Sequence, residues 1–263
     1  MKKKLLAIGL AVAVLAVTIV GMSIAYFTAT DQETNVFTVG GVKVQLIERQ
    51  RNANRTALVP FEQNKVLMPI VGSAQGEQET VGGVTLPTAE NYVDKIMTIK
   101  NTGESDAYVR IFVAVPTALQ NGQTPNAPRY DVLHWNFNGD SCAEGQWTDE
   151  IVVANQVVIN DVEYKIYSRT YTTALEKDVV TATPAYIGFY LDKTVDMHID
   201  PVTNNPVYTV DWGNGNGPEV INYDLSEGVE IPVFVQAVQA AGFDSAEAAF
   251  AASGLPANPW ANN

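Results

Sequence analysis

Apolar and polar residues alternate with a period of two over most of this chain, and this alternation constrains the fold more than any other feature. In residues 107–115, Val109, Ile111, Val113 and Val115 share one face. Similar runs occupy residues 42–46, 93–100, 151–153, 157–159, 162–168, 186–191, 207–210 and 231–240, and Asn, Asp and Gly residues punctuate them. This pattern predicts an all-β fold, an antiparallel β-sandwich of jelly-roll type with few short helices.

Helical patterns are scarce in the chain. The best one covers residues 245–253, with Asp244 as the expected cap, Glu247 three residues later and Gly254 at the stop position. A short helical turn is expected at residues 173–177, and residues 49–83 are interpreted as a long loop. We expect one β-sandwich domain over residues 26–263.

The N-terminus has the order of features that an export signal requires. Three lysines at positions 2–4 precede the apolar run 5–20, and Ser23 and Ala25 are small residues before a cut that leaves Tyr26 first. The pattern predicts a signal peptide over residues 1–25 and a secreted, extracellular or cell-surface protein. The uncharged stretch 5–25 also has the length of a membrane span, so an uncleaved signal is the one expected route to a membrane.

The acidic composition excludes several classes of partner. The net charge is −13, and removal of the three N-terminal lysines makes it more negative. Such a surface repels nucleic acid and anionic membranes. Cys142 is the single cysteine, so no intrachain disulfide can form, and we expect a free thiol that is packed or partly exposed.

Two blocks of the sequence resemble the TasA/camelysin family of secreted Gram-positive surface proteins. The first contains Ala25, Tyr26 and Phe27, then NVFTVG at residues 35–40 and the strand 42–46. The second, residues 93–110, is similar to a strand–turn–strand unit of that family. The resemblance covers residues 1–116. It implies a jelly-roll domain, processing by a SipW-type signal peptidase as partner, and assembly into fibres of a biofilm matrix.

The resemblance also implies that residues 26–39 act as a donor strand for the next subunit, so that the chain is its own partner. Phe27, Val36, Phe37 and Val39 would be the apolar anchors of this strand, and its threonines favour extended structure. A strand added to an open sheet edge satisfies backbone groups and fills side-chain pockets together. The alternative is an ordinary first strand within its own domain.

Residues 231–235 form one of the most aggregation-prone windows of the chain. Its sequence, IPVFV, combines β-branched and aromatic residues without charge. Pro232 restricts this window to a strand start or to a sheet edge, because proline has no backbone N–H for a central ladder.

The patterns of common enzymes are missing from the sequence. His134 and His198 are isolated, without the H-E-x-x-H spacing of zinc peptidases, and no nucleophile elbow, phosphate loop or dinucleotide fingerprint occurs. We therefore expect no enzyme, no cofactor and no metal site, and a camelysin-like metalloprotease is the less favoured alternative. A weak calcium candidate consists of Asp211, Asn214, Asn216 and Glu219, where a tight glycine-rich hairpin is the favoured interpretation.

These features together predict a secreted structural protein that self-assembles into fibres at the cell surface. The second prediction is a monomeric extracellular adhesion or binding module. It depends on exposed aromatic side chains, for which the candidates are Trp135, Trp147, Trp212 and Trp260.

Overall fold

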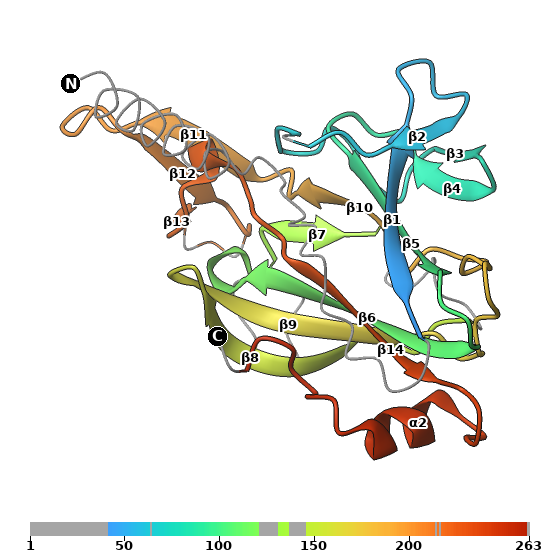
Figure 1. Cartoon of the computed structure of the whole chain (residues 1–263). Coiled ribbons are helices and arrows are strands. Elements are labelled where there is room, and N and C mark those ends of the chain that lie inside the picture. The colour runs from blue at the N-terminus through green and yellow to red at the C-terminus, as the bar shows by residue number, and fades with distance from the viewer. Residues whose placement is uncertain are drawn as a thin grey trace, which may run out of the picture.

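The computed structural model describes residues 42–63, 65–120, 131–136, 146–213, 215 and 217–261. This part of the chain is all-β, with antiparallel sheets and one α-helix (Figure 1). The all-β prediction is confirmed. The predicted signal peptide, the candidate donor strand and Cys142 lie outside the described residues.

Two sheets face each other across the main core. The first has the strand order β2-β1-β5-β10-β7, with bounds Leu58–Pro60, Val44–Arg51, Val93–Asn101, Tyr186–Leu191 and Leu133–Trp135. The second has the order β14-β6-β9-β8, with bounds Val233–Gln239, Ala107–Pro116, Val162–Thr170 and Ile151–Ile159. Within the described residues, the edge strands of the second sheet are therefore β14 and β8.

The remaining elements lie around these two sheets. A small hairpin packs beside β1, and a three-stranded sheet projects from the body at the upper left of Figure 1. The hairpin consists of β3 (Gln78–Val81) and β4 (Val84–Pro87). The small sheet consists of β11 (Val195–Ile199), β12 (Pro206–Val210) and β13 (Glu219–Val220). The helical elements are η1 (Thr117–Leu119), η2 (Leu225–Glu227) and α2 (Ala246–Ser253).

Strand β6 is buried on both faces. Val109, Ile111 and Val113 point into the main core, in which Met97 and Ile99 of the opposite sheet also lie. On the other face, Phe112 belongs to a cluster with Trp260, and Tyr108 belongs to a cluster with Phe250 of α2. The alternation predicted for this strand is therefore correct, and its second face is covered by the C-terminal segment.

Some predicted boundaries are wrong for identifiable reasons. Residues 49–83, interpreted as a loop, contain the end of β1 and the strands β2 and β3. The predicted strands 151–153 and 157–159 form one strand, β8. Two irregularities shift its register with β9. Both errors arise because bulges and short edge strands break the alternation.

The helical predictions were correct in one place and wrong in the other. Residues 173–177 form no helical turn, because Leu175 pairs with Ala107 in an isolated bridge and its side chain is buried. Helix α2 exists as predicted, but Ser245 is its cap rather than Asp244. The Ser245 hydroxyl accepts a hydrogen bond from the Ala248 N–H at 3.2 Å, and Gly254 ends the helix in the left-handed conformation.

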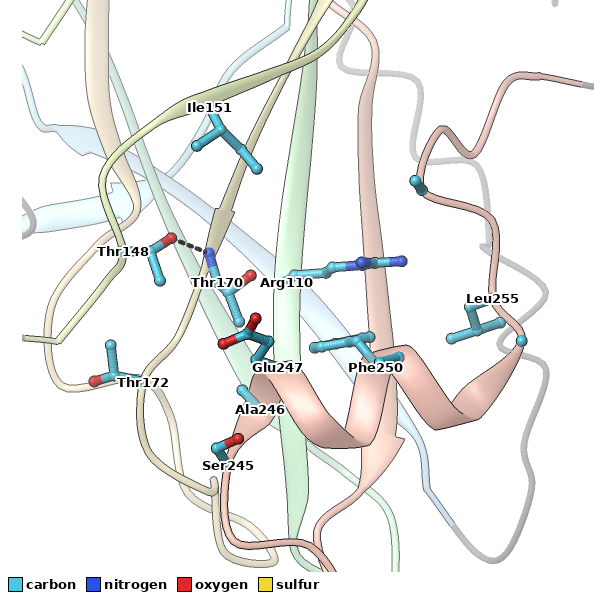
Figure 2. A pocket seen from close by; sticks show the side chains of 13 residues that line it. Arg110, Thr148, Ile151, Thr170, Thr172, Ser245, Ala246, Glu247, Phe250 and Leu255 are labelled. Atoms are coloured by element: carbon cyan, nitrogen blue, oxygen red, sulfur yellow. Dashed lines mark hydrogen bonds between the residues drawn. The ribbon is translucent and has the colours of Figure 1, made fainter.

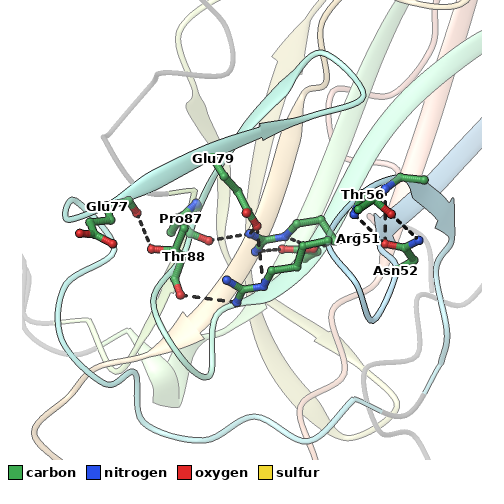
Figure 3. Close-up of polar contacts among 10 residues, drawn as sticks. Arg51, Asn52, Thr56, Glu77, Glu79, Pro87 and Thr88 are labelled. Carbon is green, nitrogen blue, oxygen red and sulfur yellow. Dashed lines mark hydrogen bonds and ion pairs between the residues drawn. The ribbon is translucent and has the colours of Figure 1, made fainter.

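The buried Arg51 side chain links β1 to β5 and to the β3–β4 hairpin by hydrogen bonds (Figure 3). Arg51 donates from Nε and Nη2 to the two carboxylate oxygens of Asp94 on β5, at 2.7 and 2.6 Å. Its Nη1 donates to Glu79 of β3 at 2.6 Å and to the Pro87 carbonyl at 2.8 Å. Because one guanidinium joins three chain segments, the extension of β1 through Arg51 depends on this network.

Replacement of Asp94 by Asn is expected to destabilise the fold by about 3 kcal/mol, because it leaves the buried Arg51 charge without its main partner. The free energy of unfolding in urea measures this effect. The matched control is Glu104→Gln, which breaks an exposed pair with Lys177 and should change stability by less than about 0.5 kcal/mol. Equal losses in the two variants would contradict the role of the buried network.

Candidate strand-acceptor site

The outer edge of β14 has the backbone geometry that an added strand requires. β14 pairs with β6 in register Val235↔Ile111 and Gln236↔Arg110. The Ala114 N–H donates to the Pro232 carbonyl and the Ala240 N–H donates to the Asp106 carbonyl, so the even-numbered residues of β14 bond to β6. In an antiparallel ladder the alternate residues then direct their backbone groups away from β6. These residues, the β14 edge, are Val233, Val235, Ala237 and Gln239.

No described strand covers the β14 edge, because β14 is the outermost strand of its sheet within the described residues. Pro232 lies immediately before β14, so the prediction that it marks a strand start or a sheet edge is confirmed on both counts. Among the described residues, the backbone groups of the β14 edge form a row to which an extended segment can bond.

A mostly apolar cavity borders the β14 edge. Helix α2 packs on the outer face of the sheet through Ala249 and Phe250, against Tyr108 and Val238. The cavity, of about 470 Å³, lies between α2 and β14. β14 is the only strand of its sheet that lines this edge cavity, whose residues are Ala237, Val238, Gln239, Ala241, Phe243, Ala249, Ala252, Ser253, Gly254, Leu255 and Pro256.

A second cavity lies on the other side of α2, over β6 and β9 (Figure 2). This inner cavity has a volume of about 720 Å³, and Thr148, Thr170, Glu247 and Phe250 are among the residues that line it. The Arg110 side chain also lines it and extends from β6 toward the segment that follows α2, as Figure 2 shows. Arg110 thus connects the inner cavity with the side of α2 that faces β14.

Among the described residues, the partners of the Arg110 guanidinium are neutral. Its Nε donates to Gln236 at 2.7 Å and its Nη2 donates to the Pro256 carbonyl at 3.0 Å. Its central carbon lies 4.3 Å from the centre of the Phe250 ring and 5.1 Å from that of Phe112. Burial lowers the pKa of Arg110 to about 10. The side chain is therefore a partly desolvated cation held between a strand and a helix.

Several predicted site residues lie outside the described part of the chain. They are the cleavage residues Ser23, Ala25 and Tyr26, the donor-strand residues Phe27, Val36, Phe37 and Val39, and the calcium candidates Asn214 and Asn216.

The two described calcium candidates bind donors of their own chain. The Asp211 carboxylate accepts a hydrogen bond from the Gly213 N–H at 2.9 Å, as in a tight turn. The Glu219 carboxylate accepts one from the indole N–H of Trp212 at 3.2 Å. Within the described ranges, no three His, Cys, Asp or Glu side chains form a group that could hold a metal ion. The glycine-rich turn is the interpretation that these contacts favour.

The two histidines lie in different environments. His134 bonds to Asp192 at 3.1 Å and stacks on Tyr190 with ring centres 5.0 Å apart, so it is packed and hydrogen-bonded. His198 is exposed on β11. Among the described residues, neither histidine belongs to a group of three His, Cys, Asp or Glu side chains that could hold a metal ion.

The tryptophans do not form an exposed aromatic platform. Trp147 and Trp260 are buried, with 4% and 3% of their surfaces exposed, and Trp135 and Trp212 are partly buried against the main core. The premise of the adhesion-module prediction is therefore not met. Sequence reasoning missed Arg110 and the two cavities, because only the packing of α2 on the sheet creates them.

Comparisons of this chain with protein-family models, with curated proteins and with solved structures found no match. The helices in the described part of the chain are all too short or too polar to span a bilayer.

The pair of His134 and Asp192 predicts a pH-dependent contribution to stability. Burial opposes ionisation of Asp192, but hydrogen bonds from His134 and Thr194 outweigh it and lower its pKa to about 2. A lowered carboxyl pKa stabilises the fold above the ordinary value near 4, and this contribution is lost as the pH falls toward 2.

The Asp192→Asn variant should therefore approach the stability of the parent as the pH falls from about 5 to about 2. The difference in unfolding free energy should shrink by about 1 kcal/mol, a value reduced for the partial exposure of the pair. Urea denaturation at several pH values measures this difference. Parallel stability curves for the two proteins would contradict the assignment.

Proposed function

We propose that this protein is a secreted structural subunit that assembles into extracellular fibres, with residues 26–39 of one copy added to the β14 edge of the next. The observation that carries the proposal is the β14 edge, which no described strand covers and which the edge cavity borders. A strand in this place gains backbone hydrogen bonds along β14 and a pocket for apolar side chains.

The residues that follow the proposed donor strand lie close to this sheet. Val42 is buried in the main core, and the Lys43 carbonyl accepts a hydrogen bond from the Thr102 N–H at 2.8 Å. β1 contacts β14 (Figure 1). Residues 26–39 would span about 46 Å when extended, at about 3.3 Å per residue, so they are long enough to pair along all of β14 on another copy.

The residue types of the proposed donor match the acceptor. Phe27, Val36, Phe37 and Val39 are apolar, and the edge cavity is lined by alanines with Val238, Phe243 and Leu255. An interface in which one end of each copy binds another surface of the next is heterologous, and it extends indefinitely if the rotation does not close. Fibres are the expected product, and we expect none from a chain that lacks residues 26–39.

We propose no enzymatic role for this chain and no cofactor. A camelysin-like protease would need a metal site, and the described residues contain no group of metal-binding side chains. The monomeric binding module keeps no specific support, since the tryptophans on which it depends are buried or partly buried. Export through a SipW-type signal peptidase remains part of the proposal, as the sequence predicts.

The first test compares protein that begins at Tyr26 with a version that lacks residues 26–39, by negative-stain electron microscopy. Fibres from the longer protein and folded monomers from the shorter one are the expected results. Persistent monomers from both, across acid, salt and calcium conditions, would overturn the fibre proposal. Folding of the shorter version is checked by its thermal unfolding transition.

A second test blocks the edge itself. Gln239→Pro removes an outward N–H of the β14 edge without removing a bond to β6, since proline is tolerated at such positions of edge strands. We expect it to reduce fibre yield strongly, while the matched control Gln239→Ala, which keeps the N–H, forms fibres as the parent does. Normal fibres from folded Gln239→Pro protein would place the acceptor elsewhere.

A further inference from the structure

Arg110 differs from the buried cations of the described chain. Arg51 pairs with Asp94 at 2.6 Å, Lys95 with Glu48 at 2.7 Å, and Arg169 with Glu150 at 3.7 Å. The Arg110 guanidinium has no carboxylate within 4.0 Å among the described residues, although Glu247 lines the same inner cavity. A partly desolvated cation in an acidic protein attracts a carboxylate from elsewhere.

The position of Arg110 directs it toward the proposed acceptor. Arg110 is level with Gln236 in the β6–β14 register, on the face that α2 covers. Its Nε bonds to Gln236 of β14, and its Nη2 bonds to Pro256, which lines the edge cavity. The guanidinium therefore extends from β6 to β14 and to Pro256, and its Nη1 makes no hydrogen bond with the described residues. A strand added to the β14 edge would bring its side chains close to this group.

The proposed donor carries charges of the complementary sign. Residues 26–39 contain two charged residues, Asp31 and Glu33, and no basic residue. Both are odd-numbered, so in an extended strand they point to the same face as Phe27 and Phe37. That face thus has a carboxylate and, four residues away, a large apolar ring.

This spacing matches the acceptor. Arg110 is level with Gln236, and the edge cavity begins at Ala237 and Val238 and continues past the end of β14 to Phe243. With an antiparallel donor, Asp31 opposite Gln236 places Phe27 four positions along, level with Ala240. With a parallel donor, Glu33 opposite Gln236 places Phe37 there. Each orientation thus presents one acid to Arg110 and one ring to the edge cavity.

We propose that Arg110 sets the register of assembly by binding Asp31 or Glu33 from the N-terminal segment of a second copy. This inference rests on the proposed function. The guanidinium donates from Nη1 to the carboxylate while the neighbouring ring fills the edge cavity. A one-residue slip would direct the acid to the opposite face of the sheet, so the pair selects one alignment from several.

The test uses protein that begins at Tyr26 and measures the critical concentration for fibre assembly. Asp31→Asn and Glu33→Gln are compared with Gln32→Ala, a control on the opposite face of the donor. One of the two neutralised acids is expected to raise the critical concentration about tenfold, which is the usual size of a lost charge-assisted hydrogen bond. The other acid and the control should leave it unchanged.

Charge reversal then identifies the pair. Arg110→Glu should impair assembly, and either Asp31→Lys or Glu33→Lys in the same chain should restore it. Restoration by position 31 indicates an antiparallel donor, and restoration by position 33 indicates a parallel one. If Arg110→Glu does not fold, Arg110→Gln replaces it, and the donor variants alone still test the pair.

The outcomes separate this inference from the function on which it rests. If both neutralised acids assemble as the parent does, while the version without residues 26–39 stays monomeric, the role of Arg110 is wrong and donor-strand assembly stands. If the version without residues 26–39 also forms fibres, the proposed function fails and this inference fails with it.

Discussion

The burial of β6 on both faces is the constraint on which the rest of the structure depends. One face needs the five-stranded sheet, and residues from both sheets meet in the main core. The other face needs a different cover. Phe250 of α2 lies in one cluster with Tyr108, and Trp260 lies in another cluster with Phe112. Because this cover is a short helix and a turn rather than a third sheet, it leaves cavities on both sides of α2. The candidate acceptor is therefore a consequence of how the second face is covered.

Much of this fold follows from local patterns in the sequence. The strands β5, β6, β9 and β10 were predicted almost to the residue, because their alternation is regular and turn residues bound them. Pro232 predicted an edge or a strand start by its missing N–H alone, and β14 meets both conditions. Helix α2 was predicted by the capping pattern of Asp244 and Glu247 and by Gly254, although its cap lies one residue later than expected.

What the sequence did not predict depends on contacts between distant segments. By its place at the end of a strand, Arg51 would be expected to be exposed. In the structure it bonds to Asp94, 43 positions later, and to Glu79. Lys95 has the residue type of a surface position, yet it is fully buried beside Glu48 and over the Phe61 ring. Arg110 acquires its environment from Gln236 and Pro256, more than 120 positions away. No periodicity within one strand contains this information, because it arises from the pairing of strands.

If the proposed export and assembly hold, the separation of donor and acceptor along the chain sets an order of events during export. The acceptor is made of β14, α2 and the turn that contains Pro256, all of which follow residue 232, whereas the proposed donor precedes residue 40. A chain that crosses a membrane from its N-terminus exposes the donor first and completes the acceptor late. On this arrangement a half-exported chain can join a fibre but cannot be extended, so growth waits for the fully folded subunit.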